Sequence, residues 1–176
     1  MIESPVTVFN CGVFLQALLS KSGPAVRCLE LIEEARIRLV LSEEILTEIK
    51  DVLLRPRFRQ RNQNLTEAKV ESLIEMLLAN AEFVENVPKH FAYSRDPDDE
   101  PYMNLAIETE AGFLVSRDKD LLDLMTDYTD QAKYFRQRFG KSELSTLLSF
   151  CKSLKERSIQ AAPRATKPTV LQRFLC

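Results

Sequence analysis

Apolar positions along this chain follow two different spacings. Short β-branched or apolar runs occur at residues 6–9, 38–41, 82–84 and 113–115. Between these runs, apolar side chains recur at the three- and four-residue spacing of helices with one buried face. Short strands that alternate with helices are typical of βαβ units. The pattern therefore predicts an α/β protein with a parallel sheet.

Capping residues indicate where most of the helices begin. Pro24 follows a glycine and suits a first helical turn, while Ser42, Thr66 and Ser142 are candidate N-caps. Acidic residues and Pro101 indicate a helix start near residue 100, and Ala111 and Gly112 indicate its end. The predicted helices run over about residues 24–35, 43–54, 67–80, 100–110 and 143–154. The segment 123–139 has no clear pattern.

Length and composition are those of one globular domain. The chain has 176 residues, of which 45% are apolar, enough to bury a sizeable core. The last twenty residues contain four basic side chains, no acid and two prolines. We therefore expect a single domain over residues 1–155 and a poorly ordered tail over residues 156–176.

Charge and cysteine content exclude several classes of protein. The formal net charge is −2, from 24 basic and 26 acidic residues, so a polyanion must be bound by a local patch. Four cysteines without a C-x-x-C pair, together with one histidine, argue against structural zinc and against a disulfide framework. Neither a long apolar segment nor a signal-peptide pattern is evident. We expect a cytoplasmic protein that does not contact a membrane.

Acidic side chains follow most of the predicted strands. Glu48 lies next to the apolar face of its helix, the segment RDPDDEP at 95–101 is dense in carboxylates, and Asp118 follows the fourth strand, whereas the first strand ends at Asn10. Acids near helix starts are common, so none of these sites is specific alone. Because ligands bind at the carboxyl ends of parallel strands, their joint placement favours a site for Mg²⁺ or Mn²⁺.

Three segments carry a family resemblance. VFNCGVFLQALLSKSGP, LVLSEEILTEIKDVLLRPRF and RDPDDEPYMNLAIETEAGFLVSRDKDLL resemble a PIN domain, in the branch described as toxin components of toxin–antitoxin systems. The resemblance covers about residues 6–150, and the third segment is its most specific part. It implies a three-layer α/β/α sandwich around four to five parallel strands. It also implies a ribonuclease that hydrolyses single-stranded RNA with one or two Mg²⁺ or Mn²⁺ ions.

The resemblance also implies roles for individual residues. Glu48, Asp99 and Asp118 match the catalytic, metal-binding acids of the family, and Asn10 stands where an aspartate is usual. Asn10 still offers one carbonyl oxygen to a cation. Three neighbouring residues are further candidates at the site: Asp98, Glu100 and Ser116. An antitoxin and a second copy of the chain are the protein partners that the family implies.

A basic segment is a candidate nucleic-acid surface. In LLRPRFRQRN, Arg55, Arg57 and Arg59 alternate with other residues and surround Phe58. These arginines can follow a phosphate backbone while Phe58 stacks on a base. The alternative is a solvated segment in which Phe58 packs into the core.

Two other functions compete with a ribonuclease. A PIN-like module that binds RNA or a protein without turnover is favoured by Asn10, which removes one carboxylate from the site. A phosphatase of the haloacid dehalogenase type also places an acid after its first strand. That class needs an Asp-x-Asp pair where this chain has Asn10 and Gly12, so it is disfavoured.

Overall fold

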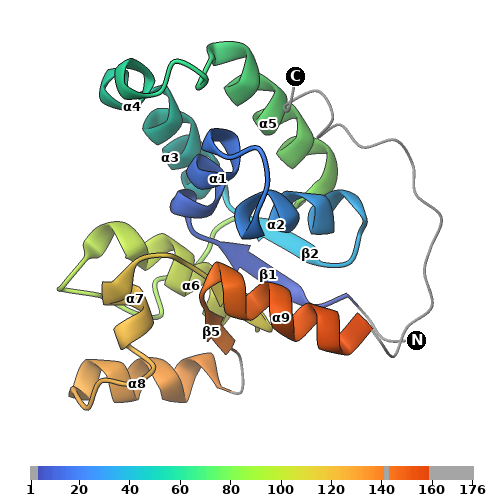
Figure 1. The fold of residues 1–176 in the computed structure, drawn as a ribbon. Coiled ribbons are helices and arrows are strands. Elements are labelled where there is room, and N and C mark those ends of the chain that lie inside the picture. Colours follow the sequence, from blue (N-terminus) through green and yellow to red (C-terminus); the bar gives the residue numbers. More distant parts are fainter. Residues whose placement is uncertain (1–3, 141–142, 159–176) are drawn as a thin grey trace.

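A five-stranded parallel sheet forms the centre of the molecule. The computed structural model describes residues 4–140 and 143–158, and its strands are ordered β3-β2-β1-β4-β5. Figure 1 shows the strands surrounded by helices. The strands are β1 (Val6–Phe9), β2 (Arg38–Leu41), β3 (Glu82–Phe83), β4 (Phe113–Val115) and β5 (Glu143–Ser145). The predicted α/β class and strand number are confirmed.

Helices connect the strands in the way that parallel pairing requires. They are α1 (Cys11–Leu19), α2 (Pro24–Glu33), α3 (Glu43–Leu54), α4 (Pro56–Arg61), α5 (Glu67–Asn80), the 3₁₀ turn η1 (Pro97–Asp99), α6 (Glu100–Glu108), α7 (Lys119–Asp123), α8 (Asp130–Phe139) and α9 (Leu147–Ser158).

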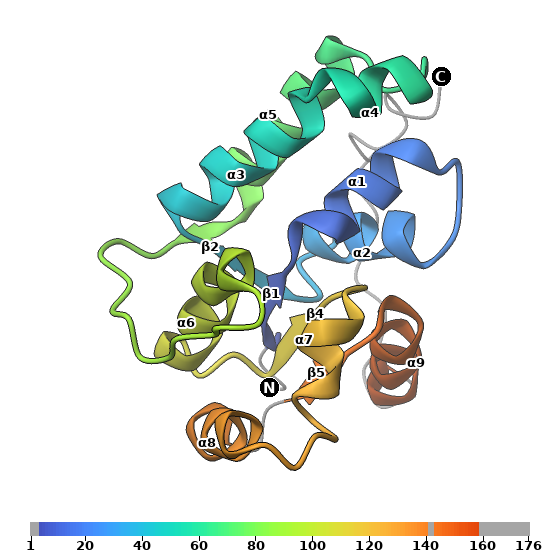
Figure 2. The same ribbon diagram turned by 90° about the vertical axis from the view of Figure 1, so that its left-hand side faces the viewer.

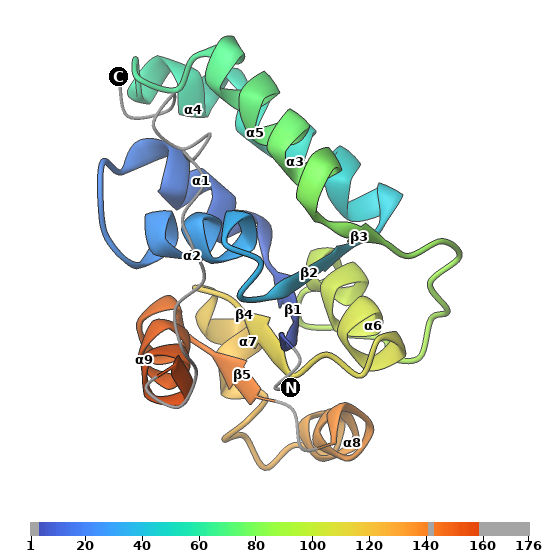
Figure 3. The ribbon, with the colours of Figure 1, turned by 90° about the vertical axis from the view of Figure 1, so that its right-hand side faces the viewer.

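The helices form layers on both faces of the sheet. Figure 2 and Figure 3 view the molecule from opposite sides, and in both α2 and α9 lie on one side of the strands while α6 and α8 lie on the other. Helices α3 and α5 pack against each other and extend away from the sheet, with α4 at their far end. This arrangement is the predicted three-layer sandwich.

Side-chain caps fix several helix starts at the expected residues. The Ser42 hydroxyl accepts the Ile45 N–H at 3.3 Å, and the Thr66 hydroxyl accepts the Lys69 N–H at 3.3 Å. Pro24 occupies the first turn of α2. The two hydroxyl caps satisfy N–H groups that have no partner inside the helix. Together with Pro24 they confirm the predicted starts of α2, α3 and α5.

The region after residue 122 departs from the sequence interpretation. A helix was expected from residue 143, but β5 occupies residues 143–145 and α9 begins at Leu147; the expected cap, Ser142, lies outside the described residues. The three-residue strand pairs with β4, and such a short run has too few positions to show alternation. Helix α8 had no clear apolar pattern in the sequence, because its buried residues are only three: Ala132, Phe135 and Phe139.

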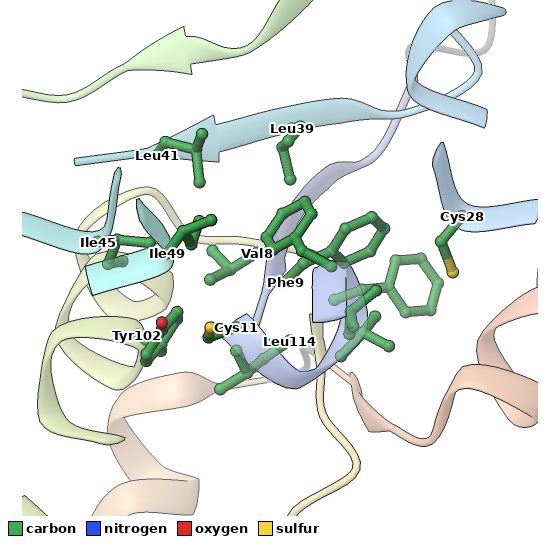
Figure 4. Packing of buried hydrophobic residues seen from close by; sticks show 14 of the residues in the cluster. Val8, Phe9, Cys11, Cys28, Leu39, Leu41, Ile45, Ile49, Tyr102 and Leu114 are labelled. Atoms are coloured by element: carbon green, nitrogen blue, oxygen red, sulfur yellow. The ribbon is translucent and has the colours of Figure 1, made fainter. Parts of the chain in front are cut away.

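The core lies on both faces of β1 and β4. Figure 4 shows Leu39 and Leu41 of β2 beside Val8, and Tyr102 of α6 beside Cys11 of α1. All of these side chains are buried, so the start of α1 is held between the sheet, α3 and α6. The residue immediately before α1, Asn10, is therefore fixed by a rigid surround.

Helix α9 is the last element of the described structure. Helix α9 reaches Ser158, beyond the expected domain boundary at residue 155, and the rest of the expected tail, 159–176, lies outside the described residues. Within the described part, Cys11, Cys28 and Cys151 are free thiols. No helix in that part is both long and apolar enough to cross a membrane.

Candidate metal centre

Three aspartates from two segments meet at the carboxyl edge of the sheet. One oxygen from each of Asp96, Asp99 and Asp118 lies within 4.8 Å of the others. Asp96 and Asp99 come from the loop and 3₁₀ turn before α6, and Asp118 comes from the loop after β4. Like charges at this separation repel one another, so the cluster needs a compensating cation or proton.

The local backbone explains why Asp96 and Asp99 act together. Asp96 is the N-cap of η1, where its carboxylate accepts the Asp98 N–H at 3.1 Å, and Asp99 is the last residue of that turn. In a 3₁₀ helix, side chains three residues apart lie one above the other. The same turn directs Asp98, which is exposed, away from that line.

Asp99 is the buried member of the cluster. Its side chain is only 5% exposed, and within the described residues its Oδ2 atom has no hydrogen-bond partner. Burial, and then the charges of Asp96, Asp118 and Glu48, raise the pKa of Asp99 to about 7. A buried carboxylate oxygen without a donor is what a bound cation would satisfy.

Asn10 holds the other oxygen of Asp99. The Asn10 Nδ2 group donates to Asp99 Oδ1 at 2.9 Å, which opposes the rise in the Asp99 pKa. The Asn10 Oδ1 atom accepts the Gly12 N–H at 2.9 Å and so caps α1. Both ends of the amide therefore have partners inside the protein, and one lone pair of Oδ1 remains.

Ser116 and Asp118 form a compact turn after β4. The fully buried Ser116 hydroxyl accepts the Asp118 N–H at 2.9 Å. The Asp118 Oδ1 atom accepts the Asp120 N–H at 2.8 Å and caps α7. Ser116 thus orients the backbone that presents Asp118.

Glu48 borders the cluster on the α3 side. It lies outside the 4.8 Å group, but its charge raises the pKa of Asp99. The pKa of Glu48 is itself raised, chiefly by burial, while the nearby Tyr102 hydroxyl and Arg55 act in the opposite direction. The Tyr102 hydroxyl is buried and makes no hydrogen bond of good geometry within the described residues, so Glu48 is near it without being fixed by it.

Glu100 is committed to the neighbouring loop. Its Oε1 atom accepts the Tyr93 N–H at 2.7 Å, and its Oε2 atom lies 2.6 Å from the Lys89 ammonium. The Lys89 charge lowers the pKa of Glu100. These contacts hold the segment before η1 against the start of α6.

Arg95 and Tyr93 attach the acidic loop to α7. The Tyr93 hydroxyl donates to the Asp120 carbonyl oxygen at 2.9 Å. The Arg95 guanidinium pairs with the Asp120 carboxylate and lies 3.8 Å from Asp123 and 3.9 Å from Asp127. Because Asp96 follows Arg95 directly and Asp118 precedes α7, these contacts bring the two halves of the cluster together.

The basic segment lies next to the Glu48 side of the site. Arg55 joins α3 to α4, and its charge acts on both Glu48 and Cys11. Phe58 packs partly against the core, and the Arg57 guanidinium lies 4.8 Å from its ring centroid. Arg59 lies 3.7 Å from Glu67. The arginines are exposed, but Phe58 already has partners on part of its ring.

The chemistry of these groups fits a divalent cation. Three carboxylates supply hard oxygen ligands, and the unpartnered Asp99 Oδ2 atom supplies a buried one. A thiolate is not offered, because burial and then Glu48 raise the pKa of Cys11 to about 12. The arrangement can therefore hold Mg²⁺ or Mn²⁺ but does not suit covalent catalysis by the neighbouring cysteine.

Sequence reasoning missed Asp96 and Arg95 as members of the site. Asp96 was visible in the acidic segment, and the Asp-Pro dipeptide at 96–97 is the signal that an aspartate caps a short turn. Reading that segment as a 3₁₀ turn would have paired Asp96 with Asp99. Arg95 had no sequence signal, because its acidic partners lie about 25 residues further along.

The chain folds as a parallel α/β sandwich with a cluster of carboxylates at the carboxyl edge of its sheet. The family model described as PIN domain matches residues 6–120, and the chain belongs to that family. It is 30% identical over 129 residues to the uncharacterized protein MJ1680 of Methanocaldococcus jannaschii, covering 73% of this chain and 78% of that protein. No solved structure matches the chain.

Membership has general consequences for function. The PIN domain family is of the nuclease type, its nucleases generally use divalent metal, and its members generally bind RNA. The acidic cluster of this chain agrees with that general function.

Proposed function

We propose that this protein is a ribonuclease that hydrolyses the phosphodiester bonds of single-stranded RNA with Mg²⁺ or Mn²⁺. The observation that carries the proposal is the cluster of Asp96, Asp99 and Asp118, whose oxygens lie within 4.8 Å. Their mutual repulsion and the unpartnered Asp99 oxygen are both relieved by a divalent ion. When bound, one or two such ions polarise water for attack and neutralise the charge of the leaving oxygen.

The chain's own residues hold and orient the reacting groups. Asp96, Asp99 and Asp118 are the ligands, and Glu48, at the border of the cluster, accepts a hydrogen bond from water or supplies a further oxygen. Asn10 fixes Asp99 through its amide N–H, so in this chain we assign it a positioning role before a ligand role. Ser116 has a positioning role for Asp118, because its hydroxyl accepts the Asp118 backbone N–H.

The exposed arginines supply a local positive charge for RNA phosphates, which the chain as a whole, with its net charge of −2, does not provide. Arg55 acts on Glu48, and Arg57 and Arg59 follow it as exposed residues of α4, so that the three can bind RNA phosphates. An RNA substrate agrees with a cytoplasmic location. A toxin role with an antitoxin, and pairing with a second copy, follow from the family resemblance and belong to the same proposal.

The test is cleavage of end-labelled single-stranded RNA with Mn²⁺, with Mg²⁺ and with EDTA. We expect cleavage only with metal, and a loss of at least about 100-fold in Asp99→Asn, since even outer-shell partners of a metal are worth about 10–100-fold. Asp51→Asn, an exposed acid on α3, is the matched control. Cleavage that persists in EDTA or in Asp99→Asn would overturn the proposal.

A binding module without turnover is the second candidate. Asn10 favours it, because the amide contributes no negative charge and both of its ends have partners in the fold. This candidate predicts that RNA binds to the native chain with Mn²⁺ but stays intact, and that Asn10→Asp restores cleavage. Robust cleavage by the native chain would exclude it.

A further inference from the structure

A cavity lies beside the end of β4, between α1, α7 and α9. Its volume is about 290 Å³, near the lower end of the roughly 300–1,000 Å³ typical of ligand pockets. Among its lining residues are Gln16 of α1, Ser116 and Arg117 after β4, Leu122 of α7, and Leu147 at the start of α9. Figure 2 shows α1, α7 and α9 around this end of β4.

The cavity shares residues with the turn that presents Asp118. Ser116 lines it, and the hydroxyl of the same residue accepts the Asp118 N–H at 2.9 Å. Arg117, which lies between Ser116 and Asp118 in the sequence, is exposed and makes no ion pair among the residues that the structure describes. A phosphate held at Asp118 therefore lies next in sequence to two residues, Ser116 and Arg117, that line this cavity.

The walls combine apolar surface with one amide. Leu122, which is half-buried, and Leu147, which is buried, both line the cavity, and the exposed part of Leu122 offers apolar surface against which a flat ring can pack. The Gln16 Oε1 atom is buried without a hydrogen-bond partner in the described part of the chain. An unpartnered buried amide oxygen costs free energy unless a ligand or water supplies a donor.

We propose that this cavity binds one base of the RNA, next to the phosphate held at the acidic cluster. Leu122 and Leu147 pack on the ring, the Gln16 amide pairs with its polar edge, and Arg117 contacts the adjoining phosphate. A glutamine amide can hydrogen-bond the polar edge of a base, and an arginine guanidinium can bind a phosphate. The inference rests on the proposed function, because it takes the substrate to be single-stranded RNA.

The experiment is methyl NMR of the full chain, with EDTA present, during titration with the four nucleoside 5′-monophosphates. Ribose 5-phosphate is the control ligand, because it has the sugar and phosphate but no base. We expect the methyl signals of Leu122 and Leu147 to shift with at least one nucleotide and not with ribose 5-phosphate. Equal shifts with ribose 5-phosphate, or none with any nucleotide, would overturn the inference.

A variant tests the amide. Gln16→Leu keeps the size of the side chain and removes no hydrogen bond with a described partner, so it is expected to fold. We expect it to weaken the preferred nucleotide about five- to tenfold, the value of one hydrogen bond. Gln63→Leu, at an exposed site beyond α4, is the matched control. Unchanged affinity in Gln16→Leu would remove Gln16 from the site.

The two proposals can fail separately. If the native chain binds nucleotides at the leucines but never cleaves RNA with Mn²⁺, the proposed ribonuclease activity is wrong and the base site stands. If it cleaves RNA with Mn²⁺ and the leucine signals do not move with any nucleotide, the base site is wrong and the ribonuclease stands.

Discussion

Replacing Asn10 by aspartate changes one atom group at the most constrained point of the site. Asn10 donates its amide N–H to Asp99 Oδ1 at 2.9 Å, and Asn10→Asp would put a second carboxylate oxygen there. The capping of α1 is preserved, because aspartate accepts the Gly12 N–H as well as asparagine does. The effect of the substitution is therefore confined to its contact with Asp99.

The magnitude follows from this contact. A hydrogen bond to a charged group is worth about 1.5–3 kcal/mol, and two charges 4 Å apart interact by about 4 kcal/mol at an effective dielectric constant of 20. Because Asp99 already has a pKa raised to about 7, it takes up a proton and so avoids much of the repulsion. We expect metal-free Asn10→Asp to lose about 3 kcal/mol at about pH 8, or about 6–12 °C in Tm.

Thermal unfolding in EDTA and in Mn²⁺ is the assay. Mn²⁺ is expected to recover most of the lost stability, because the added carboxylate strengthens metal binding to the folded state. At about pH 5 the difference between native and variant is expected to shrink, since a proton then replaces the metal. Asn64→Asp, at an exposed position, is the control. Equal stability of native chain and Asn10→Asp in EDTA at about pH 8 would refute the reasoning.

Three further predictions follow from the same geometry. The folded-state pKa of Asp99 is raised from 3.8 to about 7. The metal-free native protein is therefore expected to lose about 2–4 kcal/mol of stability as the pH rises from about 4 to about 7. Denaturant unfolding measures this loss, which is expected to be absent in Asp99→Asn. Arg95→Ala is expected to lower Tm only slightly, since exposed ion pairs are worth about 0.2–1 kcal/mol. It is also expected to weaken Mn²⁺ binding several-fold in calorimetry, because the two acidic segments separate. Unchanged Mn²⁺ affinity would mean that Arg95 does not position the site. Charge reversal at Arg57 and Arg59 is expected to weaken RNA binding and to reduce its salt slope by about one for each lost phosphate contact, with Arg36→Glu as a control outside the basic segment. An unchanged slope would leave these arginines as a solvated surface.

Local signals were sufficient for most of the fold. Three strands and the starts of α2, α3 and α5 were predicted at their observed residues, because caps, prolines and runs of β-branched residues act over a few positions. The region of α8 and β5 was not predicted. Helix α8 depends on distant partners such as Phe91, whose ring centroid lies 5.3 Å from that of Phe135. Tertiary packing of this kind leaves no local pattern.

The candidate site divides in the same way. Placement at the carboxyl edge of the sheet was predictable from the strands, and the pairing of Asp99 with Asp118 followed from it. Which acids join the cluster was not predictable from the sequence. Membership depends on the 3₁₀ turn that pairs Asp96 with Asp99 and on the salt bridges of Arg95. The position of Asn10 was known, but its hydrogen bond to a residue 89 positions away was not.

Titration of Mn²⁺ into the native chain and into Asp99→Asn, followed by the electron paramagnetic resonance signal of free Mn²⁺, tests the central claim most directly. Loss of that signal reports binding without any need for turnover. We predict saturable binding of one or two ions to the native chain and to Asp51→Asn, and affinity at least about 100-fold weaker in Asp99→Asn. Equal binding by native chain and Asp99→Asn, or no binding by either, would contradict the assignment of the acidic edge as a metal centre.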